Sequence, residues 1–180
     1  TKEIEVRSVS INNYAGRLKC FYEQWVTICD NPIVLDWLQG YKLPFIKIPV
    51  QPRAPHARAF QVSEGEQIKM EIDNLLDIGA IKSCEFCSGQ FVSSIFLADK
   101  PNGKKRFILN LKQLNKFIKT CHFKMEDTRT AIRLFQKRDC AATIDLKDAY
   151  YLLPIHKDHR KFLRLEFSGV LYEFTCLPFG

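Results

Sequence analysis

Apolar side chains recur every three or four positions near the start of the chain. From Arg17 onward they predict a helix with one aromatic-rich face; these positions are Leu18, Phe21, Tyr22, Trp25, Val26 and Cys29. A second short helix is expected from Pro32, which suits a first helical position, to Gly40, just past its end. We expect this helical hairpin to pack on a neighbouring domain. Residues 1–15 carry no such pattern and are expected to be poorly ordered.

Four prolines then interrupt the pattern, at positions 44, 49, 52 and 55. Because proline is excluded from a helix interior and disfavoured in a central strand, residues 43–62 are predicted to be an extended connector. This connector is the best candidate for a domain boundary. The predicted division is residues 1–58, a helical hairpin with its proline-rich connector, and residues 59–180, a second domain.

Helical spacing returns after the connector. Ser63 and Glu66 form the pattern of a capping box, which marks a helix start, and Gly79 marks its end. The residues expected to face inward are Ile68, Ile72, Leu75 and Leu76. A shorter helix is predicted from a cap at Asp127 or Thr128 through Phe135. Its candidate core residues are Ile132, Leu134 and Phe135.

Alternating or β-rich stretches predict the strands. Residues 80–82 form a short extended piece, and residues 90–98 and 106–111 a hairpin around Pro101-Asn102-Gly103. A second hairpin joins residues 162–167 to 170–176 through Ser168-Gly169. The apolar run 140–146 predicts a buried central strand, and residues 149–152 a helical turn that Pro154 ends. Helices mixed with antiparallel hairpins predict an α+β fold.

Composition narrows the classes of function. The 180 residues are 46% hydrophobic, enough for one sizeable core. Lys and Arg outnumber Asp and Glu by 27 to 20, and the resulting charge of +7 suits a polyanionic partner. The seven cysteines are scattered, which predicts small core residues in a reducing compartment. Cys84 and Cys87 form a CxxC without a second pair or zinc-spaced histidines, so structural thiols are favoured over zinc or redox chemistry.

The chain shows no targeting pattern. It has no signal peptide and no apolar run of the ~18 residues that cross a membrane. We therefore expect an intracellular protein, cytoplasmic or nuclear, without a membrane partner. The first residue is not Met, which suggests an excerpt of a longer chain.

Basic side chains gather at the first hairpin. Between Asp99, the one acid there, and Lys119 they are Lys100, Lys104, Lys105, Arg106, Lys112, Lys116 and Lys119. A solvated charged face is the usual interpretation of such a run. The apolar strands would anchor these charges on a rigid finger, however, which favours phosphate contacts.

The stretch from Cys140 to Tyr151 carries the candidate chemistry. A buried strand that ends in a carboxylate, Asp145, needs a partner such as a divalent metal. Asp145 could equally be the N-cap of the turn that follows. Asp148 lies one helical turn further on. His156 and His159 are expected to be exposed, and a metal role for them is disfavoured without further ligands.

Four segments together resemble a reverse transcriptase of the retrotransposon and retrovirus branch. They are KPNGKKRFILNLKQLN at 100–115, TIDLKDAYY at 143–151, YEF at 172–174 and LPFG at 177–180. The resemblance covers residues from about 63 to 180. The upstream segment, from Gly16 to Phe45, is similar to the region that precedes this domain in DIRS-type retrotransposons. Ty3-type elements are the other close group.

The resemblance implies a right-hand polymerase, with fingers and a partial palm in residues 59–180 and a helical extension before them. The reaction would be RNA-directed addition of dNTPs to a primer 3′-OH. Asp145 would be the first metal-binding and catalytic aspartate for two Mg²⁺ ions, and the Leu146 carbonyl would complete a metal shell.

The same resemblance implies a nucleotide site and a template path. The expected dNTP-binding residues are Lys100, Arg106, Asp148, Ala149, Tyr150 and Phe179. Among them, Lys100 and Arg106 would clamp the triphosphate, backbone N–H groups of Asp148 and Ala149 would hold it, and Tyr150 would exclude a ribose 2′-OH. Phe179 would contact the nucleotide or its pairing partner. Asn110 and Lys112 would touch the template.

Two departures limit this expectation. Asn110 and Lys112 stand where Asp and Arg are common, which puts their template contacts in doubt. The second catalytic element of the family, Tyr-x-Asp-Asp, does not occur in this chain. Since one carboxylate cannot hold two magnesium ions, we expect these 180 residues alone to be inactive. The expected partners are an RNA or DNA template-primer, dNTPs and the remainder of the polymerase, with its thumb and RNase H.

Two alternatives stay open. The chain could be a non-catalytic, basic nucleic-acid-binding remnant of a retroelement. It could also be a structural α+β protein with no nucleic-acid role, in which case the order of Arg106, Asp145 and Tyr150 is coincidence.

Overall fold

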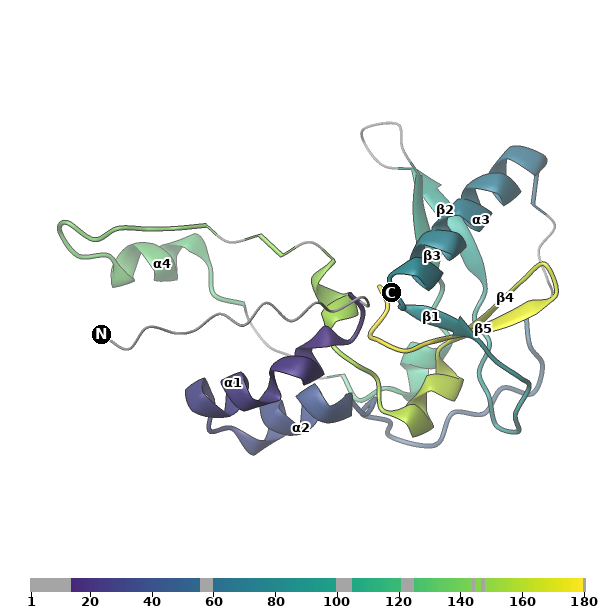
Figure 1. Ribbon diagram of the computed structural model, residues 1–180, viewed down its shortest axis with the longest axis horizontal. Coiled ribbons are helices and arrows are strands. Elements are labelled where there is room, and N and C mark those ends of the chain that lie inside the picture. Colours follow the sequence, from purple (N-terminus) through teal and green to yellow (C-terminus); the bar gives the residue numbers. More distant parts are fainter. Residues whose placement is uncertain are drawn as a thin grey trace.

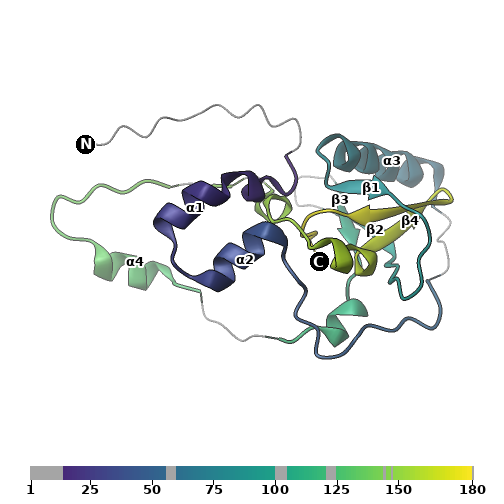
Figure 2. The ribbon, with the colours of Figure 1, turned by 60° about the horizontal axis from the view of Figure 1, so that its bottom comes forward.

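The computed structural model describes residues 14–55, 60–99, 105–120, 125–143, 145–146 and 148–179 (Figure 1). A mixed body of one long helix and two antiparallel sheets carries a helical hairpin beside it. A separate arm containing a short helix projects away from this body in both views (Figures 1 and 2). Helices and sheets in one chain confirm the predicted α+β class.

The predicted N-terminal hairpin is present. A 3₁₀ helix, Arg17–Phe21, leads into α1, Tyr22–Ile28, and α2 covers Pro32–Gly40. Asn31 caps α2, because its side chain accepts a hydrogen bond from the Ile33 N–H at 3.0 Å. The aromatic-rich face of α1 is only half-buried, and Val26 is 47% exposed. Packing on a further domain stays a prediction.

Helix α3, Val62–Asp77, begins earlier than the sequence predicted. Gln61 has the extended backbone of an N-cap (φ −62°, ψ 153°), so Ser63 already lies inside the first turn and cannot cap it. The capping-box prediction was therefore wrong. Ile68, Ile72 and Leu75 are buried as expected, whereas Leu76 is 37% exposed because it lies one position off the buried stripe.

Two antiparallel sheets follow the predicted hairpins, with shorter strands. In one, β5 (Val170–Phe174) lies between β1 (Ile81–Ser83) and β4 (Arg164–Phe167). The other pairs β2 (Ile95–Asp99) with β3 (Lys105–Leu109). The β4–β5 turn has positive φ at Ser168 (51°) and Gly169 (77°), the geometry of a tight two-residue hairpin. The Pro101-Asn102-Gly103 turn lies outside the described residues.

One apolar core joins α3 to both sheets. Its fully buried side chains include Ile68 and Ile72 of α3, Phe174 of β5, Leu165 of β4 and Leu109 of β3. Helix α3 packs on β1 and β2. Among the described cysteines only Cys176 is buried, so the prediction of core cysteines holds for that one alone.

The predicted central strand at 140–146 is wrong. Its described residues have no regular structure and are exposed. The preceding helix α4, Thr128–Leu134, is capped by Asp127 as expected. Its candidate core residues are exposed, however: Ile132 by 65%, Leu134 by 76% and Phe135 by 51%. A strand forms only where a neighbour takes its hydrogen bonds, and neither sheet of the described part includes residues 140–146 as a strand.

The helical hairpin is tied to the segment after residue 150. The Tyr41 N–H donates to the Pro154 carbonyl at 2.8 Å, and the His156 N–H donates to the Tyr41 carbonyl at 3.0 Å. The Leu43 N–H donates to Nδ1 of His159 at 3.0 Å. Both histidines are consequently half-buried, and the prediction that they are exposed was wrong.

Part of the segment predicted to be poorly ordered is also anchored. The Ala15 N–H donates to the Ile78 carbonyl at 3.0 Å, and Ala15 packs against the core. Residues 1–13 lie outside the described part. None of the described helices combines the length and apolar character needed to span a membrane.

Candidate functional site

The Asp145 stretch forms an exposed approach to a sharp turn. Asp145 and Leu146 are exposed and have no regular secondary structure. Asp148 adopts a left-handed backbone (φ 49°, ψ 41°), which Asp tolerates better than most residues. A 3₁₀ helix, Ala149–Leu152, starts directly after it, and the Tyr151 N–H donates to the Asp148 carbonyl at 2.9 Å. The first N–H groups of such a helix have no acceptor within it.

Two predicted nucleotide-binding aromatics meet beyond this turn. The rings of Tyr150 and Phe179 pack edge to face with centroids 5.0 Å apart, and those of Tyr151 and Phe179 do so at 5.1 Å. Tyr150 is 54% exposed and Phe179 40% exposed. The structure thus brings together side chains that are far apart in the sequence and leaves both rings open to solvent.

Backbone hydrogen bonds hold the two segments side by side. The Leu177 N–H donates to the Leu153 carbonyl at 2.9 Å, and the Ile155 N–H donates to the Thr175 carbonyl at 2.9 Å. Between these bonds, Pro154 and Cys176 form an antiparallel bridge. The segment that carries Phe179 is therefore fixed against the end of the 3₁₀ helix by the backbone.

Tyr151 links the turn to Gly16, just before the helical hairpin. The Gly16 N–H donates to its carbonyl at 2.7 Å. Burial, followed by the negative charges of Cys176, Asp148 and Glu71, raises the pKa of Tyr151 well above its usual range, so the phenol stays neutral. Gly16 has φ +67°, and a Cβ there would approach Cβ of Pro154 to 3.3 Å. This glycine contact was missed from the sequence, where only a helix start marked the position.

The basic hairpin supplies the other predicted residues. Arg106 lies in β3 opposite Ala98 of β2. Asn110 follows β3; its N–H donates to the Ser94 carbonyl at 2.8 Å, and its Oδ1 accepts from the Lys112 N–H at 3.2 Å. Asn110 therefore shapes the turn that presents the exposed Lys112. Lys100 lies outside the described residues. Within the described part, no hydrogen bond or ion pair joins Asn110 or Lys112 to the Asp145 stretch.

The metal ligands are incomplete within the described part of the chain. No group of three His, Cys, Asp or Glu side chains is placed there to hold an ion. Asp145 offers an exposed carboxylate, and carboxylate oxygens suit Mg²⁺. One such ligand fits a shared site only if further ligands come from elsewhere.

Curated polyproteins of a plant virus and of a yeast transposon are similar to this chain. A stretch of 126 residues, 67% of the chain, is 24% identical to an enzymatic polyprotein of Cassava vein mosaic virus. A stretch of 142 residues, 79% of the chain, is 22% identical to the Transposon Tf2-3 polyprotein of Schizosaccharomyces pombe. The matched regions are 19% and 10% of those polyproteins. No protein-family model matches the chain.

Solved structures identify the fold. The foamy viral protease-reverse transcriptase in complex with dsDNA matches 89% of this chain with a TM-score of 0.58 and 19% identity, over 38% of its own length. The chain has the fold of a reverse transcriptase region. The structure of that foamy viral protein with an RNA/DNA hybrid matches 91% of the chain with a TM-score of 0.56 and 18% identity, over 25% of its own length. The resemblance to a retroelement reverse transcriptase, predicted from the motifs, is confirmed.

The reverse transcriptase likeness covers only part of the relatives. The chain spans a tenth to a fifth of the two polyproteins. The assignment of its elements to fingers and palm, the division at residue 58 and the roles of the site residues stay predictions.

Proposed function

We propose that this chain is the part of a retroelement RNA-directed DNA polymerase that supplies the dNTP pocket and the first catalytic carboxylate. One observation carries the proposal: Tyr150 and Phe179 pack edge to face beside the Asp148 turn, on a reverse transcriptase fold. Two exposed rings next to a turn whose first N–H groups have no acceptor within the 3₁₀ helix suit a base or sugar beside a phosphate chain.

Asp145 takes the metal-binding role. Its exposed carboxylate and the carbonyl of Leu146 would hold Mg²⁺, and the remaining ligands for two ions would come from the rest of the polymerase. The bound ions supply activation of the primer 3′-OH and stabilisation of the leaving pyrophosphate. The protein's own contribution here is an exposed carboxylate three residues before the Asp148 turn.

The nucleotide is held by the turn and by the hairpin. Backbone N–H groups of Asp148 and Ala149 bind the triphosphate, and Lys100 and Arg106 complement its charge. The ring of Tyr150, which is exposed, would exclude a ribose 2′-OH and so select deoxynucleotides. The ring of Phe179 packs against that ring, with the two centroids 5.0 Å apart. Asn110 and Lys112 contact the template strand.

Primer extension on poly-rA with oligo-dT, dTTP and Mg²⁺ tests this function. The parent polyprotein is expected to synthesise DNA, and the isolated 180 residues are not. In the parent, Asp145→Asn should lower the rate roughly a hundredfold or more, because it removes several kcal/mol of metal-dependent stabilisation. Asp30→Asn, an exposed carboxylate on the helical hairpin, is the matched control and should leave the rate unchanged. Unaltered synthesis by the Asp145 variant contradicts the proposal.

A second candidate function is a non-catalytic, basic nucleic-acid-binding module. The net charge of +7 and the exposed side chains of Lys105, Lys112 and Lys116 favour it. It predicts a parent protein that binds template-primer but extends no primer under any of the conditions above.

A further inference from the structure

Backbone pairing stops partway along the outer edge of β4 and leaves a gap. The Arg164 N–H donates to the Phe91 carbonyl at 3.3 Å, and the Ser93 N–H donates to the Arg164 carbonyl at 2.8 Å. These two bonds form a single parallel bridge between Val92 and Arg164 of β4. The next bond would run from the Glu166 N–H to the Ser93 carbonyl, and it is not among the hydrogen bonds of the described residues. The chain turns away there, because the Ser94 carbonyl accepts from the Asn110 N–H at 2.8 Å.

Glu166 faces this gap with its backbone. The Phe174 N–H donates to the Leu163 carbonyl, so the alternation of an antiparallel pair directs Leu165 and Phe167 toward β5. Glu166 lies between them and therefore turns its N–H and C=O outward. Such an unpaired strand edge is a template for a further strand.

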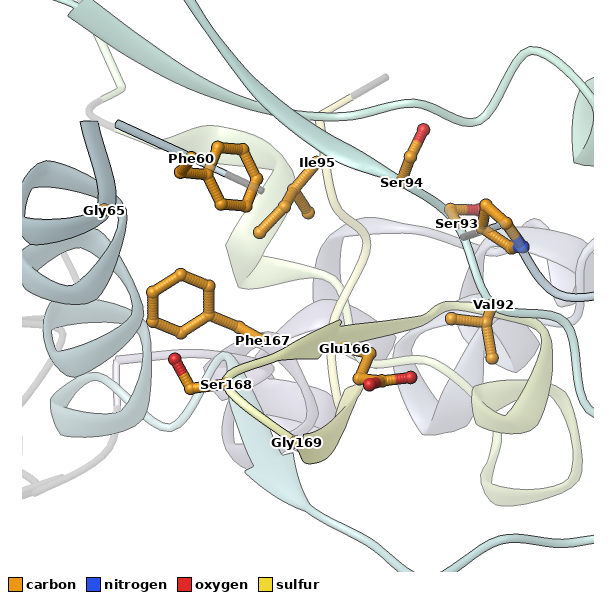
Figure 3. A pocket seen from close by; sticks show the side chains of 11 residues that line it. Phe60, Gly65, Val92, Ser93, Ser94, Ile95, Glu166, Phe167, Ser168 and Gly169 are labelled. Carbon is orange, nitrogen blue, oxygen red and sulfur yellow. The ribbon is translucent and has the colours of Figure 1, made fainter. Parts of the chain in front are cut away.

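A cavity of about 370 Å³ lies at this gap in the strand pairing (Figure 3). The rings of Phe60 and Phe167 line one part of it, 6.3 Å apart and tilted by 46°, with Ile95 nearby. Ser93 also lines it; this residue is only 4% exposed, and its hydroxyl has no hydrogen-bond partner among the described residues. A buried unsatisfied hydroxyl is costly, so a polar group entering the cavity would relieve that cost.

A second cavity meets the first at this edge. Its volume is about 680 Å³, and it shares Val92, Glu166 and Gly169 with the first. From there it extends across the sheet, over Leu171 of β5, to Cys84, which follows β1. We name the two cavities together the β4-edge groove. An extended ligand that pairs with the backbone of Glu166 would place side chains into both cavities.

The charge of the β4-edge groove is opposite to that of the protein. Among the described residues that line the two cavities, Glu85 and Glu166 are the charged ones, both exposed carboxylates, and none is a lysine, arginine or histidine. The chain as a whole carries +7. A phosphate backbone would be repelled here, whereas a cationic ligand would be attracted.

We propose that the β4-edge groove binds an extended basic peptide of a partner protein by strand addition. The ligand backbone pairs with the N–H and C=O of Glu166, and a large apolar side chain enters the first cavity beside the rings of Phe60 and Phe167. Flanking lysine or arginine side chains meet Glu85 and Glu166. This binding site is independent of the polymerase site and does not depend on that activity.

The probe is a fluorescein-labelled heptapeptide in which lysines alternate with apolar residues: valine, a central phenylalanine and valine. Anisotropy with the 180-residue chain is expected to give saturable binding below about 1 mM. Glu166→Gln should weaken it, and Glu166→Pro should weaken it roughly three- to tenfold further by removing one backbone donor. Proline is tolerated at this position because the N–H is not used by β5. Glu126→Gln, exposed at the base of the α4 arm, should bind like the wild type.

Three results would overturn the proposal. One is no saturable binding by the wild type. Another is equal affinity of Glu166→Gln and Glu166→Pro, both shown to be folded by circular dichroism, because the backbone edge would then play no part. The third is displacement of the peptide by a single-stranded RNA dodecamer, together with equal peptide affinity of the Glu166→Pro variant and the wild type. That result would make the groove a nucleic-acid site. A heptapeptide with alanine at its centre should bind several-fold more weakly if the aromatic cavity is used.

Discussion

Tyr150 and Phe179 show how single residues are fixed at the candidate nucleotide site. Each ring is restrained on one side by the other, and the backbone bonds around Pro154 hold the segments that carry them. Tyr151, the neighbour of Tyr150, is instead turned inward, where burial keeps its phenol neutral. Two adjacent tyrosines thus have different environments, and only the outer one is placed to meet a ligand.

Replacing Tyr150 by Ala should relax sugar selection in the parent polymerase. Loss of the exposed ring removes the steric barrier to a 2′-OH, so incorporation of UTP relative to dTTP should rise roughly tenfold to a hundredfold. Primer extension with each nucleotide measures the ratio. Tyr151→Phe keeps a ring and removes a neutral hydroxyl, so its ratio should stay near that of the wild type. An unchanged ratio in Tyr150→Ala would remove the selective role.

His159 makes the junction with the helical hairpin sensitive to pH. Its Nδ1 accepts the Leu43 N–H, and its ring stacks on Phe45 at 5.4 Å. Burial, followed by the positive charge of His156, lowers the pKa of His159 from 6.5. Asp158 opposes this shift, and Lys42 and Lys161 add to it. The folded state therefore favours the neutral imidazole, and its stabilising effect is complete above pH 6.5 and is lost as the pH falls below that value.

His159→Phe tests this junction, because it keeps a ring against Phe45 but cannot titrate or accept a hydrogen bond. The wild type should be the more stable protein at neutral pH, and the difference should shrink on acidification through pH 6.5. Urea midpoints at a series of pH values measure it. A difference that is constant or grows on acidification would contradict the assignment.

Helix α3 and helix α4 differ sharply at the scale of the element. Helix α3 buries an apolar stripe on both sheets, whereas α4 exposes nearly all of its apolar side chains on a projecting arm (Figure 1). Most of the stability therefore comes from the α3 side of the molecule. The arm contributes little apolar burial in this chain.

Matched substitutions in the two helices should have unequal costs. Ile72→Ala, at a position only 2% exposed, should lower the free energy of unfolding by about 2–5 kcal/mol. Ile132→Ala, at 65% exposure, should change it by less than about 0.5 kcal/mol. Urea denaturation gives both values. Similar losses would mean that α4 is packed in solution.

An ion pair between β4 and β5 is the main buried charge interaction of the larger sheet. Nη2 of Arg164 lies 2.8 Å from Oε2 of Glu173, and both side chains are nearly inaccessible. Nη1 of Arg164 also donates to the Glu85 carbonyl at 2.9 Å and to the Gln90 side chain. Lys82, 54% exposed, approaches the same carboxylate at 3.3 Å from the edge.

Arg164→Met should cost about 3–5 kcal/mol of stability, because it leaves the Glu173 carboxylate buried without its main partner. Lys82→Met should cost less than about 1 kcal/mol, since that pair is largely solvated. The double variant Arg164→Met with Glu173→Gln should recover part of the loss. Chemical unfolding distinguishes these cases, and a larger effect at Lys82 would contradict the ranking.

At the scale of the whole molecule, the two candidate binding surfaces carry opposite charges. Exposed lysines lie on and after the β2–β3 hairpin, whereas the β4-edge groove presents carboxylates. A polyanion and a basic peptide would thus find separate surfaces on one small chain.

Lys105→Ala combined with Lys112→Ala should weaken binding of an RNA/DNA hybrid and flatten its salt dependence. Each lost phosphate contact should reduce the slope of log K against log salt by about 0.7–0.9. Lys69→Ala with Lys157→Ala, two other exposed lysines, removes the same charge and should leave the slope nearer to that of the wild type. Equal slopes for the two double variants would mean that the hairpin has no special role.

The sequence by itself determined the local elements and the family likeness. Neighbouring residues decide three of these features, so short-range rules predict them. They are the helical spacing of Ile68, Ile72 and Leu75, the cap at Asp127 and the Ser168-Gly169 turn. The motif order around Asp145 likewise predicted the reverse transcriptase resemblance without any structure.

Only the tertiary structure decided which apolar residues are buried and which segments meet. The apolar run at 140–146 predicts a strand, but the described residues there form none. A strand needs a neighbouring strand for its hydrogen bonds, and the sequence pattern does not show whether one is present. The sequence predicts that His159 is exposed, but in the structure its Nδ1 accepts a hydrogen bond from the Leu43 N–H. Contacts between distant segments produce the ring contact of Tyr150 with Phe179 and the unpaired strand edge at Glu166. Those contacts depend on the packing of the whole chain.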